Sequence, residues 1–213
     1  MHEWYAAPME GLTGWRWRQV QHEMFGGAAL YVTPFVSPNG NFSFQRKELE
    51  ELDPERNRGI PVVPQILTNR AEYFVWAAKE CRSRGWAQID LNLGCPSGTV
   101  TGKKKGAGLL RQPELLRQLL DGIFDALPDM KISVKTRIGW ERAEEWPALL
   151  PLLETYPICR LTVHPRVRTQ FYKGTADREV FRWTAEHTAL PLCYNGDVTT
   201  VCDLREMGET FPD

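Results

Sequence analysis

The sequence contains little cysteine or histidine, and neither residue recurs at the spacing of a metal site. Five cysteines and four histidines are scattered over 213 residues. No Cys-x-x-Cys pair occurs, and no histidine stands at a metal-ligand spacing from a cysteine or from another histidine. An odd number of dispersed cysteines also argues against a disulfide framework. We therefore expect reduced thiols and no bound metal ion.

Long apolar segments and an excess of charge are also missing. No apolar run approaches the ~20 residues that span a bilayer, and residues 1–5 lack the basic flank and apolar run of a signal peptide. The formal net charge of -1 gives no general attraction to nucleic acid or to an anionic membrane. Contact with a polyanion would depend on local basic patches. We expect a cytoplasmic protein that does not enter the membrane.

Short strand-like runs alternate with longer helix-like runs along the whole chain, which is typical of parallel βαβ units. Strands are expected over residues 4–9, 30–33, 61–67, 88–93, 131–136, 160–164 and 190–194. Helices are expected over 14–25, 46–52, 70–84, 113–127, 142–155 and 177–187, with a last one capped by Thr199 or Thr200 and running to 207. A cap from Thr68 or Asn69 is expected for the helix over 70–84, and a kink or break at Pro147 and Pro151.

About seven strand–helix units can be counted, whereas a closed barrel of eight units typically takes ~250 residues. We predict a single domain over residues 1–213 with an α/β fold of the (β/α)8 TIM-barrel type that is incomplete at its carboxyl end. Residues 99–108 are expected as a glycine-rich, basic loop.

A thiol stands between a glycine and a proline directly after the expected strand 88–93. Gly94 permits a positive φ or a close approach by another molecule, and Pro96 disfavours the α region for Cys95. The thiol is therefore expected in an extended, sharply turned loop. This setting favours a reactive side chain, although a small hydrophobic residue capping a barrel strand also fits it.

Polar side chains gather at the expected carboxyl ends of the strands, where a (β/α)8 barrel places its reactive residues. Each also has a structural interpretation: Lys135 fits a solvated strand end, His164 a hydrogen-bonded core imidazole, and Asn195-Gly196 a turn. Their shared location on one expected face favours a functional site. They are Pro8, Met9, Glu10, Gln65, Asn92, Cys95, Lys135, Arg137, His164, Arg166, Asn195, Gly196 and Asp197.

Five segments together resemble, in order and spacing, the motifs of the tRNA-dihydrouridine synthase family. The segments are residues 7–11, 92–97, 134–137, 164–174 and 195–197, and the Asn-Leu-Gly-Cys-Pro-Ser run at 92–97 is highly specific to the family. The resemblance covers nearly the whole chain. It implies an FMN-dependent barrel enzyme that reduces the C5=C6 bond of particular tRNA uridines, with NADPH as the usual reductant.

The resemblance also implies roles for single residues. A uracil C5=C6 bond conjugated to C4=O accepts hydride at C6 and then needs a proton at C5. A thiol with a pKa near ~8.5 is mostly protonated at neutral pH, so Cys95 fits as the general acid. Assigned to FMN are Pro8, Met9 and Glu10 (largely by backbone), Gln65, Lys135, His164, Asn195, Gly196 and Asp197. Asn92, Arg137 and Arg166 are candidates for holding the uracil and its neighbourhood.

A uridine inside folded RNA must be extruded to react, and its neighbouring phosphates then need cationic contacts. Lys103, Lys104 and Lys105, with Arg166, Arg168 and Lys173, fit that role, although the lysine triplet also fits a solvated loop. We expect tRNA as the partner of a monomeric protein, with no membrane and no metal involved.

The Gly-Arg-Gly segment that the family carries in the phosphate-binding loops after strands seven and eight, and its carboxyl-terminal helical tRNA-binding domain, do not occur in this sequence. FMN binding and turnover by these residues are therefore expected to be weakened. Two alternatives remain open. One is a flavin reductase of free pyrimidines or other enones, and the other is an inactive truncated chain that retains part of a flavin or RNA surface.

Overall fold

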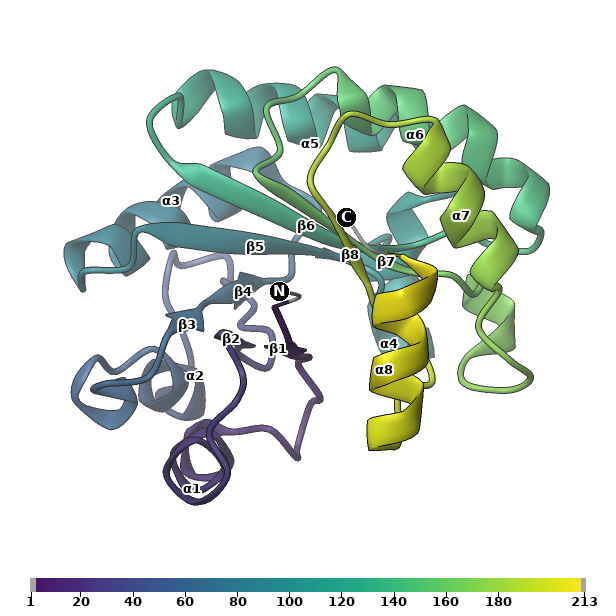
Figure 1. Cartoon of the computed structure of the whole chain (residues 1–213). Helices are drawn as coiled ribbons and strands as arrows, with labels where there is room; N and C mark the ends of the chain where they lie inside the picture. The colour runs from purple at the N-terminus through teal and green to yellow at the C-terminus, as the bar shows by residue number, and fades with distance from the viewer. Residues whose placement is uncertain (1–2, 212–213) are drawn as a thin grey trace. The chain divides into compact units, whose positions relative to one another are not determined.

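The computed structural model describes residues 3–211, and within them the chain forms two compact units. The N-terminal unit contains residues 3–92 and 114–133, and the C-terminal unit contains residues 93–113 and 134–211. Both units alternate strands with helices, so the predicted α/β class is confirmed (Figure 1).

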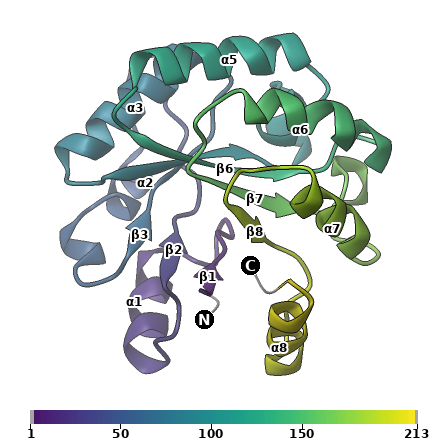
Figure 2. The ribbon, with the colours of Figure 1, turned by 45° about the horizontal axis from the view of Figure 1, so that its top comes forward.

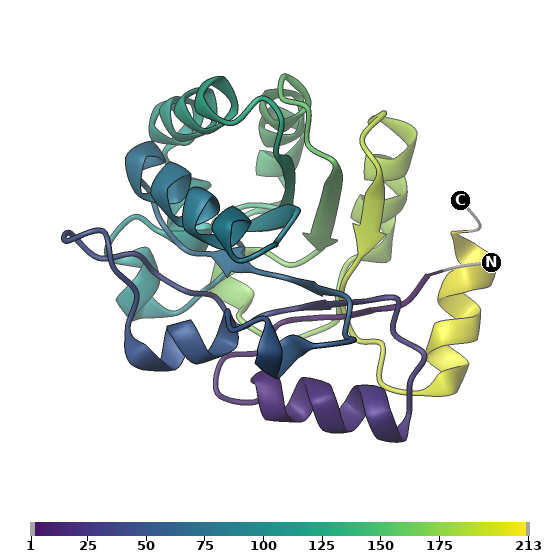
Figure 3. The same cartoon turned by 90° about the vertical axis from the view of Figure 1, so that its left-hand side faces the viewer.

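The N-terminal unit is built on short parallel strands. Strands β1 (Tyr5–Ala6), β2 (Leu30–Val32) and β3 (Val62–Val63) form one parallel sheet in the order β1-β2-β3. Strand β4 (Gln65–Ile66) pairs in parallel with β5 (Gln88–Leu93). The helices are α1 (Trp15–Met24), coloured purple in Figure 3, α2 (Arg46–Glu51), η1 (Glu55–Asn57), α3 (Ala71–Ser83) and α5 (Pro113–Ala126).

The C-terminal unit continues with the second half of β6 (Lys131–Arg137), β7 (Arg160–His164) and β8 (Leu192–Tyr194), which neighbour one another in that order. Strands β7 and β8 are parallel, with Leu161 opposite Leu192. Figure 2 shows these strands side by side, with α6 (Trp146–Glu154) and α7 (Arg178–Glu186) beside them. The remaining elements are α4 (Gly98–Thr101), η2 (Gly106–Leu109), η3 (Ala143–Glu145), η4 (Arg168–Gln170) and α8 (Val201–Thr210).

Helical periodicity accounts for the buried face of each long helix. Apolar side chains at positions i, i+3, i+4 and i+7 lie on one side of a helix. Each set below has this spacing and is buried: 74, 77, 78 and 81 in α3, 116, 119, 120 and 123 in α5, and 146, 149, 150 and 153 in α6. The expected helices at these positions are therefore confirmed.

One expected strand is two strands in the structure. Pro64 separates β3 from β4, and β3 pairs with β2 whereas β4 pairs with β5. Proline has no N–H to donate to a ladder. Its carbonyl still accepts a hydrogen bond of 2.8 Å from the Asp90 N–H. The eight strands within residues 3–211 therefore correspond to the seven strand–helix units counted in the sequence.

Local details confirm some predictions and correct others. Thr200 caps α8 by accepting a bond of 3.1 Å from the Asp203 N–H. The helix expected over 142–155 is split into η3 and α6, but the split falls before Pro147, and Pro151 lies inside α6 without ending it. The expected cap of α3 is wrong, because its N-cap is Arg70, and the Thr68 hydroxyl accepts from the Arg70 N–H instead. The expected loop over 99–108 contains α4 and η2.

Candidate active site

The predicted site residues fall into two groups, one in each unit. Pro8, Met9, Glu10, Gln65 and Asn92 belong to the N-terminal unit. The C-terminal unit contains Cys95, Lys103, Lys104, Lys105, Lys135, Arg137, His164, Arg166, Asn195, Gly196 and Asp197. Most of the second group follows the carboxyl ends of β5, β6, β7 and β8, where parallel strands present their loops.

In the N-terminal unit, Gln65 and Asn92 are buried and joined to each other. The Asn92 amide donates to Gln65 Oε1 over 2.7 Å, and the Gln65 amide donates to the Asp90 carboxylate over 2.8 Å. The other Asp90 oxygen accepts from the Ser133 hydroxyl over 2.6 Å. Buried amides need such partners, and the chain of bonds fixes the orientation of both side chains.

Residues 8–10 follow β1 as a tight turn. The Met9 N–H donates to the Thr13 hydroxyl over 2.8 Å, and the Met9 carbonyl accepts from the Thr13 N–H over 3.0 Å. The Met9 side chain is about half exposed, and Glu10 lies 3.8 Å from Lys47. The predicted backbone contacts to FMN would therefore involve the other polar groups of this turn, because the Met9 N–H already donates within the chain.

Cys95 is half-buried, and η2 packs against its backbone. The Ala107 N–H donates to the Cys95 carbonyl over 3.1 Å. Gly106 has a φ of +55°, and a Cβ at this position would lie 2.9 Å from the Cys95 carbonyl oxygen and 3.0 Å from the Cys95 Cβ. The glycine-rich segment thus supports the thiol loop from one side, a role that the sequence did not reveal.

Gly94 lies beside strand β6. Its φ is not positive, and a Cβ there would stand 3.4 Å from the Thr136 carbonyl carbon and 3.5 Å from the Lys135 carbonyl oxygen. These are ordinary van der Waals distances, so a small side chain would fit here. Neither the φ nor the packing within the chain requires a glycine, and the expected close approach by another molecule stays a prediction.

Arg137 joins two loops of the C-terminal unit. Its side chain is fully buried, its Nε–H donates to the Gly94 carbonyl over 3.0 Å, and Nη1 donates to the Val167 carbonyl over 3.1 Å. Burial lowers the pKa of the guanidinium, while Tyr172 and Cys95 partly offset that effect. Arg137 therefore orients the backbone directly before Cys95, and its predicted contact with substrate stays a prediction.

Arg166 is buried and engages at least four of its five N–H donors within the chain. It donates to the Asp197 carboxylate over 2.7 Å, to His164 Nε2 over 2.9 Å and to the carbonyls of Lys173 and Gly174. Burial alone would raise the pKa of Asp197, but bonds from Arg166 and from the Ala176 N–H hold it below the ordinary value. Arg166 thus fastens the loop after β7 to the loop after β8.

His164 is uncharged at neutral pH. Burial lowers the pKa of its imidazole to about 3, and the positive charges of Lys135, Arg137 and Arg166 add to the effect. Because Arg166 donates to Nε2, the imidazole proton resides on Nδ1. His164 is therefore a fixed, neutral hydrogen-bond donor, surrounded by cations.

The turn after β8 needs a residue without a side chain. The Asn195 N–H continues the parallel ladder to the Val163 carbonyl over 2.9 Å. A Cβ on Gly196 would lie 2.7 Å from the Ala176 Cβ and 3.6 Å from the His164 ring. A side chain at Gly196 would therefore clash with Ala176 and reach the His164 ring, so the turn lies near the histidine.

The lysine triplet lies between α4 and η2. Lys103 and Lys104 are exposed, Lys105 is half-buried, and Lys104 has a φ of +53°. Their contact with tRNA stays a prediction.

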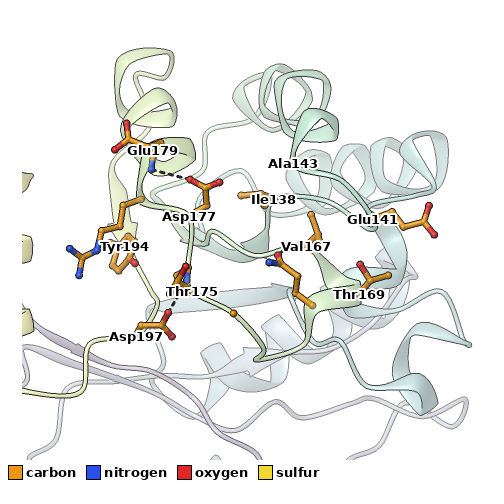
Figure 4. A pocket seen from close by; sticks show the side chains of 14 residues that line it. Ile138, Glu141, Ala143, Val167, Thr169, Thr175, Asp177, Glu179, Tyr194 and Asp197 are labelled. Carbon is orange, nitrogen blue, oxygen red and sulfur yellow. Dashed lines mark hydrogen bonds between the residues drawn. The ribbon is translucent and has the colours of Figure 1, made fainter.

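The C-terminal unit also has a pocket of about 880 Å³ that sequence reasoning missed (Figure 4). Of the predicted site residues, only Asp197 lines it. The pocket lies among the loops after β6 and β7, with Ile138, Val167 and Ala176 as apolar members and Glu141, Asp177 and Glu179 as acidic ones. No sequence pattern links residues so far apart, and only the fold brings them together.

No helix within the described residues 3–211 is long and apolar enough to cross a membrane. No group of three or more histidine, cysteine or acidic side chains within them is arranged to hold a metal ion.

Comparison with known proteins bears on these residues. Residues 5–210 match the family described as "Dihydrouridine synthase (Dus)". The chain is 32% identical over 202 residues to a "Probable tRNA-dihydrouridine synthase" of Rhizobium leguminosarum bv. phaseoli, covering 94% of this chain and 62% of the relative. It is 32% identical over 195 residues to "tRNA-dihydrouridine synthase B" of Proteus vulgaris, covering 91% of this chain and 59% of the relative. The chain thus spans about 60% of the length of such relatives.

Solved structures identify the fold. A variant of NCR from Zymomonas mobilis superposes with a TM-score of 0.65 at 12% identity, covering 98% of this chain and 79% of that one. A candidate deoxyribose-phosphate aldolase from Coccidioides immitis superposes with a TM-score of 0.58 at 14% identity, covering 96% and 75%. The fold is of the TIM-barrel type, as the alternation of strands and helices predicted.

Proposed function

Because the chain belongs to the dihydrouridine synthase family, we propose that it serves the FMN-dependent reduction of the uridine C5=C6 bond in tRNA to dihydrouridine. One arrangement carries the proposal. Arg137 donates to the carbonyl before Cys95 and to the loop after β7, and its charge also acts on His164. One buried guanidinium thereby bonds the loop that carries the thiol and acts electrostatically on the neutral histidine.

Cys95 is the proposed proton donor. The substrate gains a hydride at C6 and a proton at C5, so the thiol becomes a thiolate and later recovers its proton from solvent. The guanidinium of Arg137 lies close enough to Cys95 for the two to interact electrostatically. A nearby positive charge stabilises the thiolate that proton donation leaves behind. A half-buried position permits both contact with a base and reprotonation.

The residues of the C-terminal unit fit an anionic flavin. Lys135 is half-buried in β6 and provides a positive charge, His164 provides an Nδ1–H donor, and the Gly196 turn provides a surface without a side chain. When bound, FMN supplies the hydride, with NADPH as the source of its electrons. Gln65 and the turn at Pro8, Met9 and Glu10 are proposed FMN contacts, and Asn92 is proposed to contact the uracil.

The test compares three forms of the chain. Purified wild type, Cys95→Ala and Cys202→Ala are loaded with FMN, reduced with NADPH and mixed with unmodified tRNA, and dihydrouridine is measured in the product. Cys202 is an exposed thiol on α8 of the same unit and serves as the matched control. Loss of a general acid should lower the rate by roughly 10²- to 10⁴-fold in the Cys95 variant alone.

Other outcomes would decide against the proposal. Equal rates in wild type and Cys95→Ala would remove the thiol from the mechanism. Reoxidation of the flavin by free uracil but not by tRNA would indicate a reductase of small enones. A wild-type chain without a flavin absorbance band would indicate that these residues alone hold no cofactor.

A further inference from the structure

Two arginines and two aromatic rings form a contiguous stack in the C-terminal unit. The guanidinium carbons of Arg111 and Arg168 lie 4.1 Å and 4.7 Å from the centre of the Trp140 ring. Arg168 also lies 4.7 Å from the centre of the Phe171 ring. We call Arg111, Trp140, Arg168 and Phe171 the arginine–aromatic stack. Its members come from the segment after η2 and from the loops after β6 and β7.

Backbone bonds hold this stack in place. The Arg168 N–H donates to the Gly139 carbonyl over 2.9 Å, and the Thr169 N–H donates to the Trp140 carbonyl over 3.0 Å. The Trp140 N–H donates to the Glu145 carboxylate over 2.6 Å. Arg168 Nη2 reaches the Thr101 hydroxyl over 3.3 Å. The loops after β6 and β7 are therefore tied together at the tryptophan, and the geometry is present before any ligand arrives.

The stack concentrates positive charge without compensation. Neither Arg111 nor Arg168 forms an ion pair with another of residues 3–211, although both guanidinium groups lie within 5 Å of one ring centre. Two like charges beside the same ring repel each other, and cation–π attraction to that ring offsets part of this cost. Arg111 is exposed, so its N–H edge is available and matches a phosphate in a bidentate manner, whereas Arg168 donates to Thr101 and its Nε is buried.

Exposed rings continue the stack toward the thiol loop. Phe171 is 39% exposed and its neighbour Tyr172 is 69% exposed. Tyr172 lies beside the guanidinium of Arg137, which contacts the carbonyl of Gly94. Exposed rings next to unpaired cations suit nucleic acid, because bases stack on rings while phosphates bind guanidinium groups. An acidic peptide would use the charges but not the ring faces.

We propose that the arginine–aromatic stack, with Tyr172, binds the unpaired RNA strand next to the extruded uridine. The guanidinium edge of Arg111 holds a phosphate, and the ring of Tyr172 stacks on a neighbouring base. The choice of RNA as ligand rests on the function proposed above. A phosphate could also belong to FMN, and the experiment separates these two sources.

The experiment measures tRNA affinity at several salt concentrations for wild type, Arg111→Ala, Arg111→Lys and Arg205→Ala, with an unmodified tRNA transcript as the probe. Arg205 is exposed on α8 and is the matched control for loss of one charge. The logarithm of the binding constant falls as the logarithm of the salt concentration rises, and loss of one phosphate contact makes this slope less steep by roughly 0.7 to 0.9. We expect that decrease in Arg111→Ala only. Arg111→Lys should retain the slope and bind more weakly, because lysine lacks the planar fork.

Several results would overturn the inference. These are an unchanged slope in Arg111→Ala, an equal decrease in Arg205→Ala, or no tRNA binding by the wild type. Weaker FMN binding by Arg111→Ala with unchanged tRNA binding would assign the phosphate to the cofactor. If dihydrouridine forms but the slope is unchanged, the stack is refuted and the proposed function stands. If the slope falls but no dihydrouridine forms, the RNA surface stands and the proposed function fails.

Discussion

Replacing Gly106 by alanine should displace the thiol loop. Gly106 has a left-handed φ of +55°, which costs an alanine about 1–2 kcal/mol. The added Cβ would lie 2.9 Å from the Cys95 carbonyl oxygen and 3.0 Å from the Cys95 Cβ. Neither atom is the end of a flexible side chain, so the backbone must shift, and overpacking of this kind costs about 1–3 kcal/mol more. We expect a total loss of roughly 2–5 kcal/mol in the free energy of unfolding.

Gly98→Ala is the matched control within the same segment. A Cβ at Gly98 meets no atom within 4 Å, and its φ is not left-handed. Gly98 begins α4, where alanine is the better helix former by up to about 1 kcal/mol. We therefore expect this variant to be as stable as the wild type or slightly more so.

The assay reads Cys95 directly. Iodoacetamide is added at several pH values, and mass spectrometry follows alkylation of the peptide that contains residue 95, separately from the other four cysteines. Displacement should change the rate and pH profile of Cys95 alkylation in Gly106→Ala while Gly98→Ala follows the wild type. A shift of about 1 Å should also lower dihydrouridine formation by up to ~10²-fold. Identical alkylation profiles in all three proteins, with equal unfolding free energies, would refute the reasoning.

Three further predictions concern buried charges. The pKa of His164 is about 3 in the folded chain, against an ordinary value of 6.5, so between these pH values only the unfolded chain binds the proton. The free energy of unfolding should therefore decrease as the pH falls from 6.5 toward 3, by roughly 2–3 kcal/mol at pH 4.5. Urea unfolding of His164→Gln should lack this pH-dependent decrease. Equal pH dependence in both proteins would contradict it. Arg137→Lys keeps the charge but loses the planar guanidinium that reaches the Gly94 carbonyl. It should lower the free energy of unfolding by about 1–3 kcal/mol and change the rate of Cys95 alkylation. Wild-type values in both measurements would contradict the positioning role of Arg137. Arg18→Met leaves the Glu51 carboxylate without its ion-pair partner at 2.8 Å and should lower the free energy of unfolding in urea by about 3–5 kcal/mol. The double variant Arg18→Met/Glu51→Leu should regain part of that loss. An unchanged free energy of unfolding in Arg18→Met would show that the pair does not stabilise the fold.

Local pattern alone predicted most of the secondary structure. Strands over 88–93 and 160–164 have the predicted bounds, because alternating apolar residues and their flanking turns are properties of neighbouring positions. Where prediction failed, a longer-range or more specific cause was present. Pro64 divides a strand according to which neighbour each half pairs with, and the Thr68 hydroxyl bonds the Arg70 N–H one residue before α3 begins.

The sequence by itself determined the fold class, the family and the residue types of the candidate site, because motifs and periodicities are readable along one chain. Only the tertiary structure decided what those residues touch. Arg137 meets Gly94 and Val167, 43 and 30 positions away, and Arg166 meets Asp197, 31 positions away. Gly106 supports Cys95 through a left-handed backbone conformation that the sequence does not predict. The physical reason is that burial and charge pairing depend on distances in space, which separation along the chain does not specify.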